Sequence, residues 1–137
     1  MAYWLMKTEP SSWSWQDQTT KKITAWDGVR NYQASNNMKA MRLGDLCFFY
    51  HSVSERQIVG IVRVCREYYP DHTDETGRFG MVDVEYVADM PTPVSLDQIK
   101  LVPELQNLAL IRQSRLSVMP IDERSWKVLC QMGGYQS

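Results

Sequence analysis

The chain has 137 residues, 44% of them hydrophobic, with 7 glycines and 6 prolines. This length accommodates one domain, and the composition excludes a disordered or collagen-like chain. The formal net charge is −1 at pH 7, so the overall charge gives no indication of a nucleic-acid partner. We therefore expect a single globular domain over residues 1–137.

The three cysteines, Cys47, Cys65 and Cys130, are far apart and form no CxxC motif or Cys/His cluster. Neither a zinc site nor a disulfide framework is indicated, and no metal is expected. The start, MAYWLMKTEP, has no basic segment followed by a long apolar run, and no apolar stretch approaches the ~20 residues that span a bilayer. We expect a soluble, cytoplasmic protein with no membrane partner.

Apolar alternation predicts five strands separated by short helices, which indicates an α+β fold built on a strongly bent mixed sheet that closes toward a barrel. Asn36 is predicted to cap one helix and Asp122 the last one, and the prolines of PTPVS (91–95) should stop the strand before them. A cleft is expected where the loop after the first strand, the loop around Trp26 and the end of the 45–52 strand meet. The predicted strands are 3–7, 45–52, 57–69, 81–90 and 115–121, and the predicted helices are 14–19, 36–45, 96–100 and 122–132.

Charge is unevenly distributed along the chain. Residues 67–75 contain four acidic side chains and no lysine or arginine. Residues 21–44 are basic, and a basic face beside a small site could attract phosphates even in a neutral protein. The alternative is an ordinary solvated helix surface. The basic residues of this segment are Lys21, Lys22, Arg30, Lys39 and Arg42, against the single acid Asp27.

Four of the five tryptophans fall within the first 26 residues, which is compatible either with core packing or with an aromatic pocket wall. Trp26 begins the stretch WDGVRNYQASNN, in which Arg30 and Asn31 follow closely. Amides and an arginine beside an indole can bind the edge and face of a planar polar ligand. The same residues could instead end a loop and cap a helix.

Specific motifs cover nearly the whole chain in order. They are YWLMKTEP (3–10), WDGVRNYQASNNMKAM (26–41), GDLCFFYHS (44–52), IVGIVRV (58–64), YPDHT (69–73), MVDVEYV (81–87) and RLSVMP (115–120). In these motifs the chain resembles the EVE domain family, which has a PUA-like fold and includes many small bacterial proteins. One departure is the short segment DETGRFG (74–80), where family members often carry a longer loop and where Phe79 lies near the usual tryptophan.

The resemblance implies a PUA-like pseudo-barrel surrounded by short helices, similar in fold to YTH domains. It also implies that the protein is a nucleic-acid-binding module and not an enzyme with a known reaction. The implied partner is DNA or RNA carrying a modified base, such as methylated or hydroxymethylated cytosine, held in an aromatic pocket. Such a base needs flat aromatic partners for its faces and polar groups for its edge. No cofactor is expected, and the protein is expected to be a monomer or weak dimer.

The candidate site residues follow from these motifs. Trp26 is the candidate stacking face, although it could be a core residue. Asn31 could bind the base edge or complete a turn, and Arg30 could bind phosphate or pair with Asp27. The full expected set is Trp26, Asn31, Lys7, Thr8, Tyr50, His51, Ser52 and Ser117 for the base, and Arg30, Lys39 and Arg115 for phosphate.

Two other classes of function compete with base recognition. Some PUA-like domains are hydrolases that use a lysine, a threonine and a carboxylate, and Lys7, Thr8 and Glu9 supply these residue types. Consecutive residues of a strand do not share a face, so these three would converge only through a turn at Glu9. Cys47 and His51 would lie ~13 Å apart on one strand, too far for direct proton transfer. No catalytic motif is present, so an enzyme is not expected.

The third class is a protein-interaction module. It would be favoured if Trp26, Arg30, Asn31 and residues 50–52 were buried apart instead of lining one open cavity with a basic rim.

Overall fold

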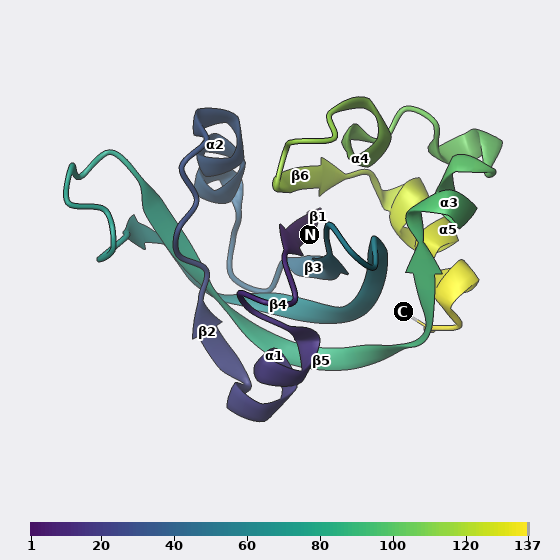
Figure 1. The fold of residues 1–137 in the computed structure, drawn as a ribbon, viewed down its shortest axis with the longest axis horizontal. Coiled ribbons are helices and arrows are strands. Elements are labelled where there is room, and N and C mark those ends of the chain that lie inside the picture. The colour runs from purple at the N-terminus through teal and green to yellow at the C-terminus, as the bar shows by residue number, and fades with distance from the viewer. Residues whose placement is uncertain (137) are drawn as a thin grey trace.

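Six strands form one bent sheet in the computed structural model, which describes residues 1–136 (Figure 1). The strand order is β2-β5-β4-β3-β1-β6. The neighbours β1 and β3 are parallel, and every other neighbouring pair is antiparallel. This arrangement confirms the predicted α+β fold with a bent mixed sheet. The strands are β1 (Tyr3–Thr8), β2 (Ile23–Ala25), β3 (Leu46–His51), β4 (Gln57–Pro70), β5 (Gly80–Ser95) and β6 (Val118–Ile121).

Short helices surround the sheet, and several begin with the capping residues that the sequence supplies. Ser14 forms a capping box with Asp17 at the start of one helix, Ser95 does the same with Gln98 at another, and Asp122 caps the last. Within residues 1–136 no helix is both long enough and apolar enough to cross a membrane. The helices are α1 (Trp15–Lys21), α2 (Tyr32–Ala40), α3 (Leu96–Lys100), α4 (Ala109–Arg112) and α5 (Glu123–Gly133), with a 3₁₀ turn η1 (Pro103–Leu105).

The N-cap of helix α2 lies five residues earlier than the sequence predicted. Asn31, not Asn36, is its N-cap, because the Asn31 Oδ1 accepts a hydrogen bond of 2.9 Å from the Ala34 N–H. The helix ends at Ala40, where Met41 is already extended. The predicted helix over 36–45 was therefore wrong at both ends, and Asn36 lies inside the helix.

Strand β5 continues through the prolines that were expected to stop it. Ile58 pairs with Val94 and Gly60 pairs with Asp89, so residues 90–93 of β5 lie opposite the single residue Val59. These residues form a bulge in which no regular ladder of hydrogen bonds is required, and proline is compatible with that position. In contrast, the last strand is shorter than predicted and begins only at Val118.

Buried aromatic rings pack against both faces of β3. On one face, the Phe48 ring stacks on Trp126 of α5 with centroids 3.9 Å apart. On the other, Phe49 contacts Trp15 at 4.9 Å and Trp26 at 5.5 Å. Phe48 and Phe49 thus point to opposite faces of the strand, as successive residues of a strand do. Phe49 thereby supports the start of α1 and the segment after β2, which matter most for the site.

The beginning of β1 is anchored by a buried carboxylate. Trp4 is 6% exposed, and its indole Nε1–H donates to the Asp45 Oδ2 at 3.0 Å. Asp45 also accepts from the backbone N–H of Ala2 and of Arg42. The Gly44-Asp45 turn thus fixes the first strand against β3.

Candidate functional site

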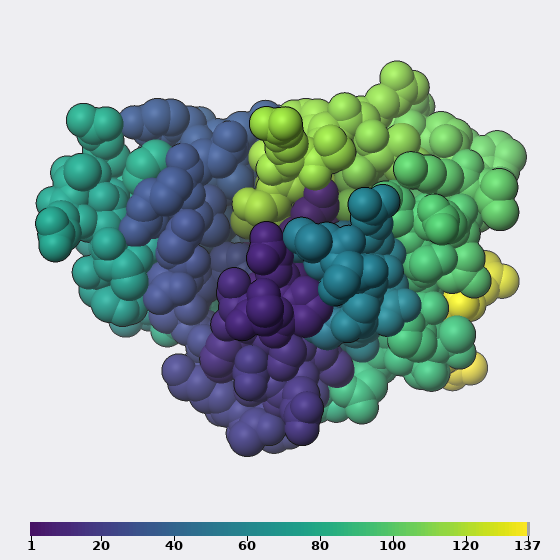
Figure 2. All heavy atoms as spheres, in the orientation of Figure 1, coloured from purple at the N-terminus to yellow at the C-terminus, as the bar shows by residue number. Residues whose placement is uncertain are grey.

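A cavity of about 530 Å³ opens between the end of β1, the segment that enters α1 and the loop after β2. This volume is within the ~300–1,000 Å³ typical of small-ligand pockets. Figure 2 shows the surface hollowed between the purple N-terminal segment and the dark-blue segment that precedes α2. The lining residues are Lys7, Thr8, Ser12, Trp13, Lys21, Thr24, Ala25, Trp26, Asp27, Gly28, Val29, Arg30, His72 and Ser117.

Two tryptophans line this cavity in different ways. Trp26 is only 7% exposed, and its ring meets Phe49 edge-on at an interplanar angle of 90°. Trp13 is half-buried, its Nε1–H donates to the Gln18 Oε1 at 2.9 Å, and the Lys21 ammonium lies 5.7 Å from its ring centroid. Trp26 is therefore a fixed inner surface, while Trp13 presents more of its ring to a ligand.

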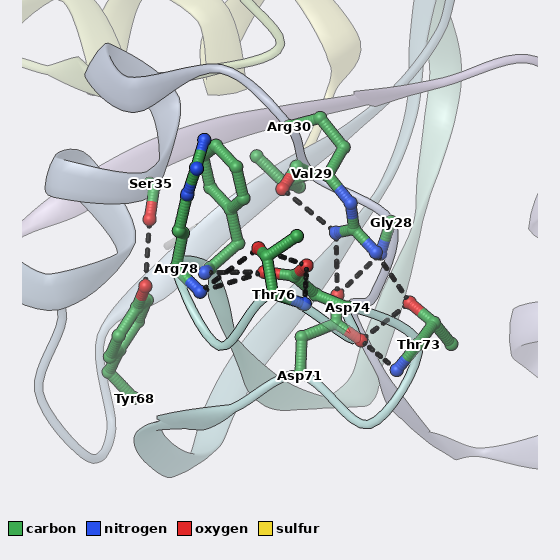
Figure 3. Close-up of polar contacts among 11 residues, drawn as sticks. Gly28, Val29, Arg30, Ser35, Tyr68, Asp71, Thr73, Asp74, Thr76 and Arg78 are labelled. Atoms are coloured by element: carbon green, nitrogen blue, oxygen red, sulfur yellow. Dashed lines mark hydrogen bonds and ion pairs between the residues drawn. The ribbon is translucent and has the colours of Figure 1, made fainter.

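The loop from Trp26 to Arg30, here called the loop wall, is held by the buried carboxylate of Asp71 (Figure 3). The Asp71 Oδ2 accepts from the Gly28 N–H at 2.8 Å and from the Arg30 guanidinium at 3.1 Å. Its Oδ1 accepts from both the backbone N–H and the hydroxyl of Thr73. Arg30 thus pairs with Asp71, and the alternative pairing with Asp27 is not what the structure shows. Gly28 has a φ of +78°, a conformation that suits glycine.

These hydrogen bonds keep Asp71 ionised. Burial alone would raise the pKa of Asp71, but the donors from Thr73, Gly28 and Arg30 outweigh it and lower the pKa to about 2. The loop wall is consequently held by hydrogen bonds to the ionised carboxylate of Asp71. Arg30 keeps part of its guanidinium available, because its side chain is 39% exposed.

Lys7 closes the opposite side of the cavity. Its ammonium donates to the Ser114 carbonyl at 2.9 Å, which joins the end of β1 to the segment before β6. Burial lowers the pKa of Lys7. With Lys21 and Arg30, it gives the cavity three cationic side chains, and the cavity can therefore attract an anionic or electron-rich planar ligand.

Comparison with known proteins assigns the family. Residues 2–132 match the EVE domain. The chain belongs to the EVE domain family.

Solved and curated relatives extend this assignment. A crystal structure of an Agrobacterium tumefaciens protein is 47% identical, covers 98% of this chain and 94% of that chain, and superposes with a TM-score of 0.96. Thymocyte nuclear protein 1 of Rattus norvegicus is 35% identical over 95% of this chain and 73% of that protein. Human THYN1, crystallised in complex with DNA containing 5-methylcytosine, is 31% identical with full coverage of both chains and a TM-score of 0.92. The Mmi1 YTH domain, at 12% identity and a TM-score of 0.56, shares the fold.

Five of the expected site residues of this EVE domain lie together at the cavity. Lys7 and Thr8 come from the end of β1, Trp26 and Arg30 from the loop wall, and Ser117 from the segment before β6. Of the residues whose convergence was to separate a base-binding module from a protein-interaction module, Trp26 and Arg30 line this cavity, whereas Asn31 and residues 50–52 do not.

The end of β3 lies outside the cavity and supports it from behind. Tyr50 and His51 are 2% and 7% exposed, and they pair in register with Lys7 and Thr8. The His51 Nε2 accepts from the Trp15 N–H at 2.9 Å, and the Ser52 N–H donates to the Thr8 carbonyl at 2.9 Å. The three residues were expected in the pocket because they end a strand beside it, but none of them is in the lining, and the second nitrogen of the His51 ring lies 3.1 Å from the Glu55 carboxylate.

Three further expected residues also lie away from the cavity lining. Asn31 directs its side-chain oxygen to the first turn of α2. Lys39 lies at the far end of the same helix with its ammonium 5.5 Å from the Tyr68 ring centroid, and Arg115 is exposed outside the lining. Of the five basic residues in 21–44, only Lys21 and Arg30 therefore line the cavity.

The residues considered for catalysis do not assemble. Glu9 is exposed and outside the lining, while Lys7 is bonded to the Ser114 carbonyl. Cys47 is fully buried, and burial together with the Asp45 carboxylate raises the pKa of its thiol. Residues 1–136 contain no group of three or more His, Cys, Asp or Glu side chains placed to hold a metal.

Sequence reasoning did not single out Trp13, Lys21 or His72 for the cavity, nor Asp71 beneath it. The signal for His72 and Asp71 was present in the YPDHT motif, which carries both residues. Trp13 was visible only as one of four early tryptophans. Its place became evident once α1 was seen to turn it toward the loop wall.

Proposed function

We propose that this EVE domain binds DNA containing 5-methylcytosine and receives the modified base in the cavity between the end of β1 and the loop wall. The observation that carries this proposal is the lining itself, in which two indoles and three cationic side chains surround one opening. Similarity to human THYN1, which was crystallised with DNA containing 5-methylcytosine, supports the same class of partner.

The lining supplies what an unstacked base requires. The half-buried Trp13 ring offers a flat partner, and stacking on an aromatic side chain contributes ~1–3 kcal/mol per base. Apolar atoms of Ala25 and Val29 lie in the same lining and provide a surface for a methyl group. Burial of one methyl is worth only ~0.8 kcal/mol, so the rigid loop wall must contribute to discrimination by excluding a loosely fitting base.

The cationic side chains suit the strand that flanks the base. Lys21 is exposed at the rim, and Arg30 retains free guanidinium surface. Contacts of this kind make binding salt-dependent, because each neutralised phosphate releases counterions. Binding is therefore expected to weaken as the salt concentration rises.

The test is a titration of the protein with oligonucleotides identical in sequence except for one cytosine, which is unmodified, 5-methylated or 5-hydroxymethylated. Single-stranded DNA, duplex DNA and RNA form separate series. The expected result is tighter binding of 5-methylcytosine DNA than of its unmodified counterpart. Equal binding of all oligonucleotides, or no binding, would overturn the proposal.

The matched variants are Trp13→Ala, Trp13→Phe and Tyr32→Ala. Trp13→Ala should weaken binding of the methylated DNA about tenfold, while Trp13→Phe keeps a flat ring and should recover part of the loss. Tyr32 is 60% exposed but lies outside the cavity lining, so Tyr32→Ala should bind as the unaltered protein does. Trp26 is the poorer choice for substitution because it is buried in the core.

A further inference from the structure

Asp27 differs from every other charged residue of the cavity. It contributes the only carboxylate among the lining residues, and it is exposed to the opening. Its carboxylate has no hydrogen bond and no ion pair with any side chain or backbone group of residues 1–136. Arg30, the nearest arginine in sequence, is occupied by Asp71. The backbone of Asp27 is nevertheless fixed, because its N–H donates to the Ala25 carbonyl at 3.0 Å.

Among the lining side chains, only the Asp27 carboxylate accepts hydrogen bonds without being able to donate one. Hydroxyl groups rotate and can donate or accept, and an imidazole can do either according to its tautomer. Ammonium and guanidinium groups only donate. The hydroxyl, imidazole and cationic members of the lining are Thr8, Ser12, Thr24, Ser117, His72, Lys7, Lys21 and Arg30.

This distinction matters for a pocket that accepts a 5-methylated pyrimidine. Thymine carries the same 5-methyl group as 5-methylcytosine, so a niche for the methyl cannot tell the two bases apart. They differ at position 4, where cytosine has an amino donor and thymine has a carbonyl acceptor, and at N3, which accepts in cytosine and donates in thymine. A carboxylate therefore favours cytosine only where it meets position 4. The cationic side chains of the lining would favour the thymine carbonyl, and a carboxylate placed at this edge would oppose it.

We propose that Asp27 is the residue by which this cavity selects a 4-amino pyrimidine over thymine, accepting a hydrogen bond from the exocyclic amine. The assignment rests on the proposed function, since it concerns the same cavity. It adds Asp27 as the group that rejects thymine, a far more abundant base with nearly the same shape as 5-methylcytosine.

The experiment compares two single-stranded DNA oligonucleotides that differ only in having 5-methylcytosine or thymine at one position. The unaltered protein should bind the 5-methylcytosine strand about tenfold or more tightly, the usual effect of a hydrogen bond to a charged partner. Asp27→Asn should collapse this ratio toward one, because its amide can rotate and donate to the thymine carbonyl. Asp97→Asn removes an exposed carboxylate of α3 outside the lining, causes the same change in charge, and should preserve the ratio.

A base without a substituent at position 4 gives a second measurement. A strand carrying 5-methyl-2-pyrimidinone should bind the unaltered protein about tenfold more weakly than the 5-methylcytosine strand, while Asp27→Ala should bind both strands alike. Circular dichroism of each variant establishes that it is folded.

The outcomes separate the two proposals. If the unaltered protein binds no 5-methylcytosine DNA, the proposed function and the role of Asp27 are both overturned. If it prefers 5-methylcytosine over cytosine and over thymine, but Asp27→Asn keeps the second preference, only the role of Asp27 is overturned.

Discussion

The two walls of the cavity are built by different means. The loop wall, residues 26–30, is fastened from beneath by one buried carboxylate, Asp71, that comes from the far end of β4. The opposite wall, residues 12–21 and here called the helix wall, is held by exposed hydrogen bonds of the Ser14 cap, by the His51 ring and by packing of Trp15. One wall depends on a single charge, and the other on several weaker contacts. Loss of the group that holds the loop wall should therefore lower the free energy of unfolding more than loss of one contact of the helix wall.

The largest expected effect is that of Asp71→Asn. The amide has nearly the same shape but brings N–H donors toward Gly28, Arg30 and Thr73, which now donate to the carboxylate. We expect the free energy of unfolding to fall by about 2–4 kcal/mol. The lower part of this range is expected because the Arg30 side chain is 39% exposed to solvent. Urea denaturation measures this change. A loss below about 0.5 kcal/mol would show that the loop wall does not depend on Asp71.

Acid should test the same wall without any substitution. The pKa of Asp71 is lowered to about 2 from an ordinary value of 3.8, so its stabilising effect is present above pH 4 and is lost as the pH falls from about 4 to 2. The loss should amount to about 2 kcal/mol. The pKa of Asp74 is also lowered to about 2, so each of Asp71→Asn and Asp74→Asn should lose only its own share of the fall, and the double variant should lose both. Equal acid sensitivity of Asp71→Asn and the unaltered protein would contradict this account.

Gly60→Ala, a substitution in β4 behind the helix wall, should have a smaller but distinct effect. A Cβ at Gly60 would lie 2.0–2.4 Å from the Trp15 indole, so the ring must move from its place against Phe49. We expect a loss of about 1–3 kcal/mol and a change in tryptophan fluorescence. In a Trp15→Ala background the same substitution should cost little, because the clashing ring is gone. Additive losses in the double variant would show that the clash is not the cause.

Local patterns predicted those parts of the fold that depend only on neighbouring residues. The helices α3 and α5 and most of β1, β3 and β4 follow from capping residues and alternation, and they were found close to their expected bounds. The extent of β5 could not be predicted in this way. Its prolines are accommodated because four residues lie opposite Val59, a bulge defined by the register with β4.

The residues of the candidate site likewise include some that local motifs predicted and some that depend on distant packing. The family motifs brought attention to Lys7, Thr8, Trp26, Arg30 and Ser117, which share the cavity. The pairing of Arg30 with Asp71 spans 41 residues and depends on where the β4–β5 turn folds back. Tyr50, His51 and Ser52 end a strand beside the cavity. The packing of α1 and β1 decides whether their polar side chains point into the cavity or away from it. No spacing in the sequence contains that information.

The smallest expected effect is that of Ser14→Ala at the start of α1. The Ser14 hydroxyl accepts from the Asp17 N–H at 3.0 Å, and the Asp17 carboxylate accepts from the Ser14 N–H at 3.0 Å. Loss of this cap should cost ~1 kcal/mol and increase hydrogen exchange in the first turn of α1. Because Trp13 directly precedes the cap, binding of 5-methylcytosine DNA should weaken slightly while Asp71 still holds the loop wall. A matched Ser95→Ala removes the equivalent cap of α3, which is outside the cavity lining, and should lower stability by a similar amount with binding unchanged. If both variants weakened binding equally, the effect would come from overall stability and not from the position of Trp13.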